Sequence, residues 1–291
     1  MKILFYGNCQ TQVAMSAVAL SNPTVQVDYA GNSRRVAKFD PERTERLFDW
    51  CDHIVTQPVM NTDNPDHHEV LRGRFGDKVI FMPYVWVDGL FSLVAAPGGK
   101  ERRGDSGFLG DVHVTEHLRR TDLAQTIQDY QEGRLDFQHA KRFEASMTEM
   151  ARREAFTDVK VAPFVRDHYR DRTMMLTHNH PHPEVINEIA RQIAARLGLS
   201  YQQVTMANPL PYEMITLPEF GRILSPYGVR DLGLRYGYDL QWLRVGRDMI
   251  TQIAEGLDTE AGTEARAENV EREARRAERQ AARREQKRAR H

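Results

Sequence analysis

Along the first part of the chain, apolar and polar positions follow two different periods, and segments with one period alternate with segments that have the other. Short apolar or alternating runs predict strands, and amphipathic stretches with a period near 3.6 predict helices. Asp40 followed by Pro41 is a typical helix start, with the aspartate as N-cap and the proline at the first helical position. The expected strands cover 2–6, 25–29, 53–56 and 78–81, and the expected helices cover 11–20, 41–50 and 66–74.

Strands and helices that alternate with short connections indicate an α/β fold, a three-layer arrangement with a parallel sheet between helices. The pattern changes at about residue 88. The segment 88–170 predicts a helical insertion rather than an independent domain. After it we expect a strand at 173–176, a loop at 177–183, and an amphipathic helix at 184–197, followed by Gly198 as its C′ residue. A last core helix at 240–255 completes one predicted α/β domain over 1–257. The expected helices of the insertion cover 112–119, 122–132 and 137–156.

The C-terminal segment 258–291 has a different composition from the rest of the chain. It is rich in Ala, Glu and Arg and has almost no large apolar residue, so it predicts a charged exposed helix or a disordered tail. Its basic residues outnumber its acidic ones, so contact with a partner protein or an anionic membrane surface is the alternative to a solvated tail.

Composition excludes some classes of function. A formal net charge of -1 argues against a nucleic-acid partner. Two cysteines are too few for a disulfide framework. No apolar run is long enough for a signal peptide or a membrane span. We therefore expect a cytoplasmic protein, with the tail as the segment suited to peripheral contact with the inner membrane.

The first turn of the chain carries candidate chemistry. Gly7, Asn8, Cys9 and Gln10 join the first expected strand to the first expected helix. Backbone N–H groups at a helix N-terminus stabilise an anion, so we expect a lowered pKa for the Cys9 thiol and an oxyanion hole beside it. Asn8 and Gln10 are suitable neutral donors for that hole. The alternative is that Cys9 is a small residue that fills a turn.

Three histidines occupy alternate positions in the expected loop 177–183, namely His178, His180 and His182. They predict a general acid or base at the same sheet edge as Cys9. A metal site and an exposed loop are the alternatives. We expect no bound metal, because no further ligands stand at a suitable spacing.

Other polar residues follow the expected strands. Gln57 ends the third strand, and Pro83 and Tyr84 follow the fourth, so all three are expected at the edge where Cys9 lies. Arg34 and Arg35 follow the second strand and form either a phosphate-binding pair or an exposed surface pair.

The Gly-Asn-Cys-Gln turn at 7–10, Gln57, and His180 with Pro181 resemble the WcbI family of polysaccharide-biosynthesis proteins. The resemblance implies a fold similar to the SGNH hydrolases and binding of coenzyme A or acetyl-CoA. It also implies transfer of an acetyl group to a saccharide, a precursor of a capsule or surface polysaccharide. Arg34, Arg35, Pro83 and Tyr84 are the candidate residues for binding coenzyme A.

The sequence departs from the pattern of the SGNH hydrolases at one position. Those enzymes place an aspartate three residues before the catalytic histidine, and here that position holds Thr177. Either another group orients His180, or a Cys9–His180 dyad suffices, with His178 as the reserve base.

In the expected mechanism the Cys9 thiolate takes the acyl group and His180 activates the acceptor hydroxyl, while the Cys9 N–H with Asn8 or Gln57 holds the oxyanion. A direct transfer, in which Cys9 only shapes the pocket, is the alternative. Two other functions remain open: an esterase or deacetylase acting on glycan or lipid esters, and a non-catalytic partner in a glycan-assembly complex.

Overall fold

The structure is a computed structural model, which describes residues 1–32, 39–93, 111–203 and 224–257. The predictions for the charged tail and for Arg34 and Arg35 lie outside the described residues. The described residues divide into two compact units. The first contains the described residues of 1–90, 138–203 and 228–237, and the second those of 91–137, 224–227 and 238–257.

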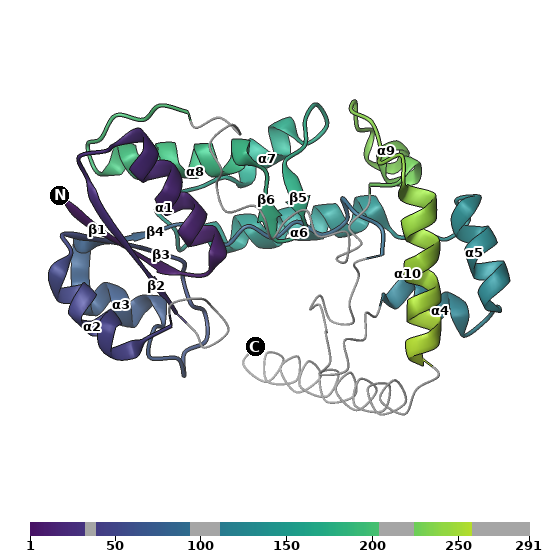
Figure 1. Ribbon diagram of the computed structural model, residues 1–291, viewed down its shortest axis with the longest axis horizontal. Coiled ribbons are helices and arrows are strands. Elements are labelled where there is room, and N and C mark those ends of the chain that lie inside the picture. The colour runs from purple at the N-terminus through teal and green to yellow at the C-terminus, as the bar shows by residue number, and fades with distance from the viewer. Residues whose placement is uncertain (33–38, 94–110, 204–223, 258–291) are drawn as a thin grey trace, which may run out of the picture. The chain divides into compact units, whose positions relative to one another are not determined.

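A parallel four-stranded sheet forms the centre of the first unit, and it confirms the α/β class (Figure 1). The strand order is β2-β1-β3-β4, and every neighbouring pair is parallel. The strands β1, β3 and β4 are almost entirely buried, whereas the edge strand β2 is buried only over its last three residues. Their bounds are β1 Lys2–Gly7, β2 Gln26–Gly31, β3 His53–Thr56 and β4 Val79–Phe81.

Helices cover both faces of this sheet. Figure 1 shows α1 (Cys9–Ser21) and α8 (Pro183–Arg196) on one face, and α2 (Pro41–Trp50) and α3 (His68–Phe75) on the other. The alternation of β1 explains this division, because Leu4 and Tyr6 pack with the apolar side chains of α2 and α3. The predicted cap of α2 is present: Asp40 Oδ1 accepts a hydrogen bond of 3.0 Å from the backbone N–H of Arg43. A 3-10 turn, Gly76–Lys78, follows α3.

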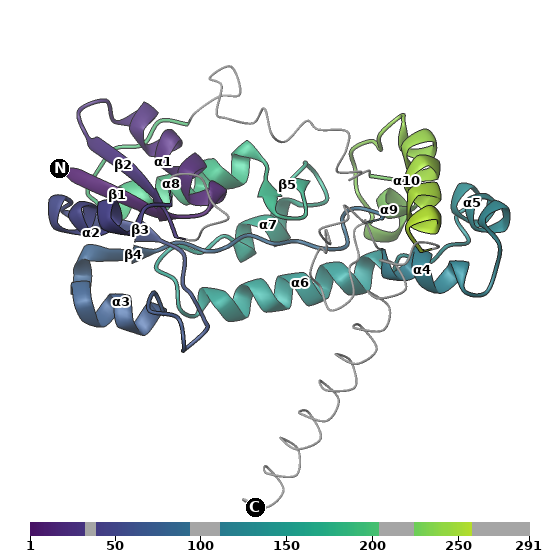
Figure 2. The ribbon, with the colours of Figure 1, turned by 60° about the horizontal axis from the view of Figure 1, so that its bottom comes forward.

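The first unit also contains a hairpin where the sequence predicted one strand and a loop. β5 (Met175–Thr177) pairs antiparallel with β6 (His180–Pro181), and these strands form a separate two-stranded sheet. The segment after the insertion therefore does not return to the parallel sheet. Two helices precede the hairpin, the long α6 (His139–Glu154) and the short α7 (Ala162–His168). Figure 2 shows α7 between α6 and β5. The sequence analysis did not predict α7, which has seven residues.

The second unit contains the helices α4 (Val112–Leu118), α5 (Leu123–Gln131) and α10 (Trp242–Leu257). A further short helix, α9 (Pro226–Leu232), has residues in both units. The buried apolar side chains of α10, among them Ile250 and Ile253, pack with Tyr130 of α5 and Val114 of α4.

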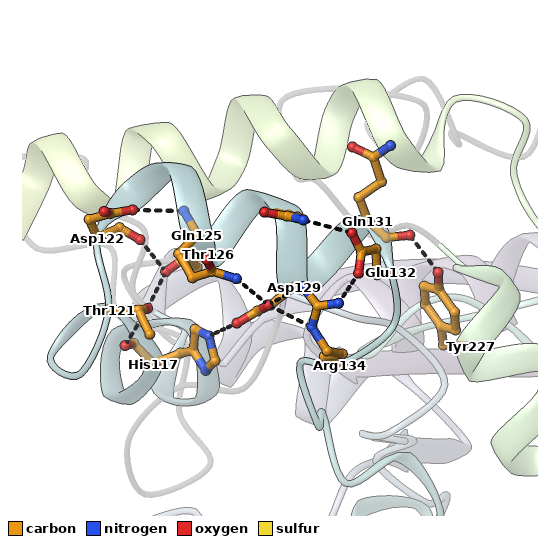
Figure 3. A network of polar contacts seen from close by, with 11 residues as sticks. His117, Thr121, Asp122, Gln125, Thr126, Asp129, Gln131, Glu132, Arg134 and Tyr227 are labelled. Carbon is orange, nitrogen blue, oxygen red and sulfur yellow. Dashed lines mark hydrogen bonds and ion pairs between the residues drawn. The ribbon is translucent and has the colours of Figure 1, made fainter.

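A polar network centred on Asp129 ties α4 to α5 in the second unit (Figure 3). Asp129 accepts hydrogen bonds from Gln125 Nε2 at 2.8 Å and from Arg134 Nε at 2.8 Å, and its Oδ2 lies 2.7 Å from His117 Nε2. The hydrogen bond from Gln125, together with those from Arg134 and His117, lowers the pKa of Asp129 to about 2. The carboxylate therefore stays charged and holds the turn between the two helices.

In the described part of the chain no helix is long and apolar enough to cross a membrane.

Candidate active site

The candidate site begins at the junction of β1 and α1. Asn8 is the N-cap of α1, and its Oδ1 accepts a hydrogen bond of 2.9 Å from the backbone N–H of Gln10. Cys9 is therefore the first residue of the helix and is exposed to solvent. Gly7 is required here, because a Cβ atom at this position would collide with the side chain of Thr11.

His180 meets Cys9 from the hairpin, 171 residues further along the chain. Cys9 Sγ lies 3.7 Å from His180 Nε2, within hydrogen-bonding distance for sulfur. The hairpin pairs Thr177 with His180 across its two strands, and Thr177 Oγ1 lies 2.8 Å from His180 Nδ1. The position that departs from the hydrolase pattern thus supplies the hydrogen-bonding partner of the imidazole.

Gln10 connects the two halves of this site. Its Nε2 donates hydrogen bonds to the carbonyl oxygens of Val85 at 2.8 Å and Asn179 at 2.7 Å. Its Oε1 accepts from the backbone N–H of Val85 at 2.9 Å and from Gln57 Nε2 at 3.3 Å. Both hydrogens and both acceptor positions of the amide are in use. Gln10 thus holds the hairpin turn and the segment after β4 against the start of α1.

The pKa of the Cys9 thiol differs from the value expected from the sequence. The sequence predicted a lowered pKa, but desolvation by the surrounding protein atoms raises it above its ordinary value. The backbone N–H groups of Cys9 and Gln10 act in the opposite direction without reversing the shift. The helix N-terminus alone therefore does not make Cys9 a thiolate.

A pocket of about 320 Å³ lies beside the site and entirely within the first unit. It brings together predicted site residues from three strand ends: Asn8, Gln57 and Tyr84. Asn32, which follows β2, also lines it. The predicted convergence of strand ends at one sheet edge is therefore present around this pocket.

The sequence did not identify the charged wall of this pocket. Arg152 and Arg153 come from the last turn of α6, and Thr157 follows the helix. Both guanidinium groups are paired with Glu149, at 2.7 Å from Arg152 Nε and 2.7 Å from Arg153 Nε. Arg152 and Arg153 thereby lower the pKa of Glu149 to about 2. Two arginines that share one carboxylate leave an excess positive charge at the pocket.

The remaining predicted site residues have other surroundings. His178 is buried and packs edge-on against Trp86, with 4.1 Å between the ring centroids. His182 is the N-cap of α8. Gln57 is buried, and its Nε2 also donates to the carbonyl oxygen of Pro83 at 3.5 Å. Among the described residues, no group of three or more His, Cys, Asp or Glu side chains is arranged to hold a metal ion.

The site and the fold together define an α/β protein with a cysteine and a histidine in contact at the carboxyl end of a parallel sheet. Residues 2–202 match the family model described as polysaccharide biosynthesis enzyme WcbI. The chain belongs to the WcbI family of polysaccharide biosynthesis enzymes, as the resemblance predicted.

A solved structure of WcbI has the same fold. It superposes with a TM-score of 0.63 at 17% sequence identity, over 87% of this chain and 90% of that one. That protein is described as a novel polysaccharide biosynthesis enzyme, in its native form without a disulfide bond between coenzyme A and one of its cysteines. No curated protein matches the chain.

Proposed function

We propose that this protein transfers an acyl group, in the first instance acetyl, from acyl-coenzyme A to a hydroxyl group of a surface-polysaccharide precursor. The observation that carries the proposal is the 3.7 Å contact between Cys9 Sγ and His180 Nε2 at the N-terminus of α1. A thiol with a neighbouring base and backbone N–H groups has the parts that acyl transfer needs.

In the first half-reaction, His180 Nε2 takes the thiol proton while Cys9 Sγ attacks the carbonyl carbon of the thioester. The carbonyl oxygen becomes negative and is held by the Cys9 N–H and by Asn8 Nδ2. Within the described residues Asn8 Nδ2 makes no hydrogen bond, whereas the amide nitrogen of Gln57 is engaged. The sulfur of coenzyme A then leaves with the proton from Nε2, and an acetyl thioester remains on Cys9.

In the second half-reaction, the oxygen of the acceptor hydroxyl attacks the carbonyl carbon of the acetyl group while His180 Nε2 takes the hydroxyl proton. Cys9 Sγ leaves and recovers the proton, which returns the enzyme to its starting state. In the direct variant the hydroxyl oxygen attacks acetyl-CoA itself, and His180 Nε2 takes the hydroxyl proton and passes it to the departing sulfur of coenzyme A. Both variants use the same base, so they differ only in whether Cys9 carries the acetyl group.

The pocket beside Asn8 is suited to part of coenzyme A. Its volume of about 320 Å³ stands at the lower end of the range for small-molecule sites, so it would hold one portion of the ligand. Arg152 and Arg153 would bind phosphate oxygens, which arginine contacts in bidentate geometry. Tyr84 would contact an uncharged part of the ligand. Coenzyme A supplies the acyl thioester, and these residues position it.

Intact-mass measurement after incubation with acetyl-CoA tests the covalent route. We expect the wild-type chain to gain the mass of one acetyl group, and Cys9→Ala to gain none. An acceptor hydroxyl should then remove the added mass. Loss of the acetyl group to water alone would instead indicate a hydrolase. If Cys9→Ala turns over at a near-normal rate, acetyl transfer is direct.

Calorimetric titration with coenzyme A tests the donor independently of turnover. We expect binding to weaken by about 10-fold or more in Arg153→Glu, because reversal of one charge removes a phosphate contact of about 1.4 kcal/mol or more. The matched control is Arg166→Glu, since Arg166 pairs with Glu144 on the surface and does not line the pocket. Absence of heat at millimolar coenzyme A in the wild-type protein would contradict the proposed donor.

A further inference from the structure

A chain of two hydrogen bonds runs behind the imidazole of His180. Thr177 Oγ1 lies 2.8 Å from His180 Nδ1 and donates its hydrogen to Asn179 Oδ1 at 3.0 Å. The antiparallel pairing of Thr177 with His180 produces this arrangement, because directly opposed residues of a hairpin present neighbouring side chains. Thr177 is 4% exposed, so water does not compete for its hydroxyl.

The number of hydrogens on this hydroxyl determines the state of the imidazole. A threonine hydroxyl carries one hydrogen, and the carbonyl oxygen of an asparagine side chain only accepts. When the hydrogen of Thr177 is donated to Asn179, the hydroxyl oxygen accepts from His180, and Nδ1 must carry the proton. In the neutral ring Nε2 is then the acceptor, and Nε2 is the nitrogen next to Cys9 Sγ.

We infer that Thr177 is a positioning residue that selects, through its hydroxyl, the Nδ1–H tautomer of His180, so that Nε2 is the basic nitrogen facing Cys9. The inference rests on the proposed role of His180 as the base. Selection of the tautomer matters because the other neutral tautomer presents an N–H to Cys9 and cannot take a proton from it.

Gln10 keeps this chain of hydrogen bonds in place. Its Nε2 donates to the backbone oxygen of Asn179 at 2.7 Å and fixes the hairpin turn relative to α1. The first helix therefore carries Cys9 and also fixes the position of the hairpin turn. That turn contains Asn179, whose side-chain oxygen accepts the hydrogen bond from Thr177. Thr177 is uncharged, so it orients the imidazole without adding the negative charge that an aspartate would place beside Nδ1.

Nuclear magnetic resonance of the imidazole nitrogens tests this inference on the protein without substrate. In uniformly ¹⁵N-labelled protein at a pH where the ring is neutral, two-bond ¹H–¹⁵N correlations distinguish the protonated nitrogen from the other. The signals of His180 are identified by their loss in His180→Asn. We expect the Nδ1–H pattern in the wild-type chain and in Thr177→Ser, which keeps the hydroxyl. We expect loss of that pattern in Thr177→Val, which keeps the shape of the side chain.

Steady-state acetyl transfer is the second readout. We expect kcat to fall about 10²-fold or more in Thr177→Val, the usual contribution of a general base, while KM for acetyl-CoA stays unchanged and Thr177→Ser restores the rate. An Nε2–H pattern in the wild-type chain, or an unchanged pattern in Thr177→Val, overturns the inference. The tautomer measurement needs no turnover, so failure of the proposed acetyl transfer would be seen separately.

Discussion

The exposed thiol of Cys9 is subject to two opposing effects. Desolvation raises its pKa, and the N–H groups at the start of α1 lower it by less. The free protein therefore holds Cys9 as a thiol rather than a standing thiolate, and in the proposed mechanism its proton moves to His180 Nε2 as the thiol reacts. The helix N-terminus is visible in the sequence, whereas the desolvation that opposes it arises only when distant segments pack around the sulfur.

Alkylation by iodoacetamide measures this balance, because the thiolate is the reacting species. We expect the rate at Cys9 to rise with pH through a midpoint above 9, the ordinary value for a thiol. Cys51 is buried and should stay unlabelled in the native protein, so mass spectrometry assigns the label. A rate that is already at its plateau below pH 7 would contradict this expectation and indicate a thiolate–imidazolium pair.

Gln10 is a residue whose loss should affect stability as well as activity. Gln10→Ala removes the hydrogen bond to the buried N–H of Val85 and the two hydrogen bonds that Gln10 Nε2 donates to the carbonyl oxygens of Val85 and Asn179. Since each unsatisfied buried group costs about 1–3 kcal/mol, we expect the free energy of unfolding to drop by about 2–4 kcal/mol in urea titration.

The control for this measurement is Gln12→Ala, two positions further along the same helix. Gln12 is only partly buried, and in the described residues its side chain makes no hydrogen bond. We expect its substitution to change stability by less than about 0.5 kcal/mol. Equal losses in the two variants would mean that the hydrogen bonds of Gln10 are not what holds the site.

At the scale of elements, local chemistry made the first half of the chain predictable. The start of α2 follows from Asp40 and Pro41, and the strand β3 has the predicted bounds. Gly198 has the positive φ of 68° expected of a C′ residue. The hairpin of β5 and β6 was not predicted, because β6 has two residues and no alternation. A strand of two residues is recognised by its pairing with a neighbouring strand, because it is too short to show an alternation of apolar and polar residues.

The start of α8 has a titratable cap. His182 Nδ1 accepts a hydrogen bond of 3.4 Å from the backbone N–H of Glu184, which requires the unprotonated nitrogen. Burial lowers the pKa of His182 below its ordinary value of 6.5. The unfolded chain therefore binds the proton first, so the contribution of His182 to stability is complete above pH 6.5 and declines as the pH falls through that value.

Thermal unfolding of the wild-type chain and of His182→Asn between pH 8 and 5 tests this cap. Asparagine caps a helix without titrating in this range. We expect the difference in Tm, wild type minus variant, to become more negative as the pH falls below 6.5. A difference that stays constant over the range would show that His182 does not titrate on unfolding.

At the scale of the whole molecule, the candidate site combines residues that the sequence could and could not reveal. Cys9, Gln57 and Tyr84 follow strands, so the rule for parallel sheets is enough to predict that they share one edge. Arg152 and Arg153 belong to an amphipathic helix that carries several other charged residues, and nothing in that pattern marks two arginines as pocket residues. Only the path of α6 past the sheet edge identifies them.

The division into two units predicts that a packing defect in the second unit stays there. Gly246 of α10 lies against the ring of Tyr130, which is 1% exposed and donates a hydrogen bond of 3.1 Å to the carbonyl of Trp242. In Gly246→Ala the added Cβ would overlap this ring, so we expect a local destabilisation of about 1–3 kcal/mol.

Hydrogen exchange followed by mass spectrometry locates this defect. We expect faster exchange in peptides from 123–131 and 242–257, and unchanged exchange in peptides from 2–21 and 175–196, which contain Cys9 and His180. Arg247→Ala is the matched control, since Arg247 is exposed on the same helix and its replacement adds no atom toward Tyr130. Coenzyme A binding, if it uses the pocket of the first unit, should be the same in both variants. Faster exchange around Cys9 in Gly246→Ala alone would show instead that the two units fold as one, and that the geometry at His180 depends on helices that contribute no residue to the pocket.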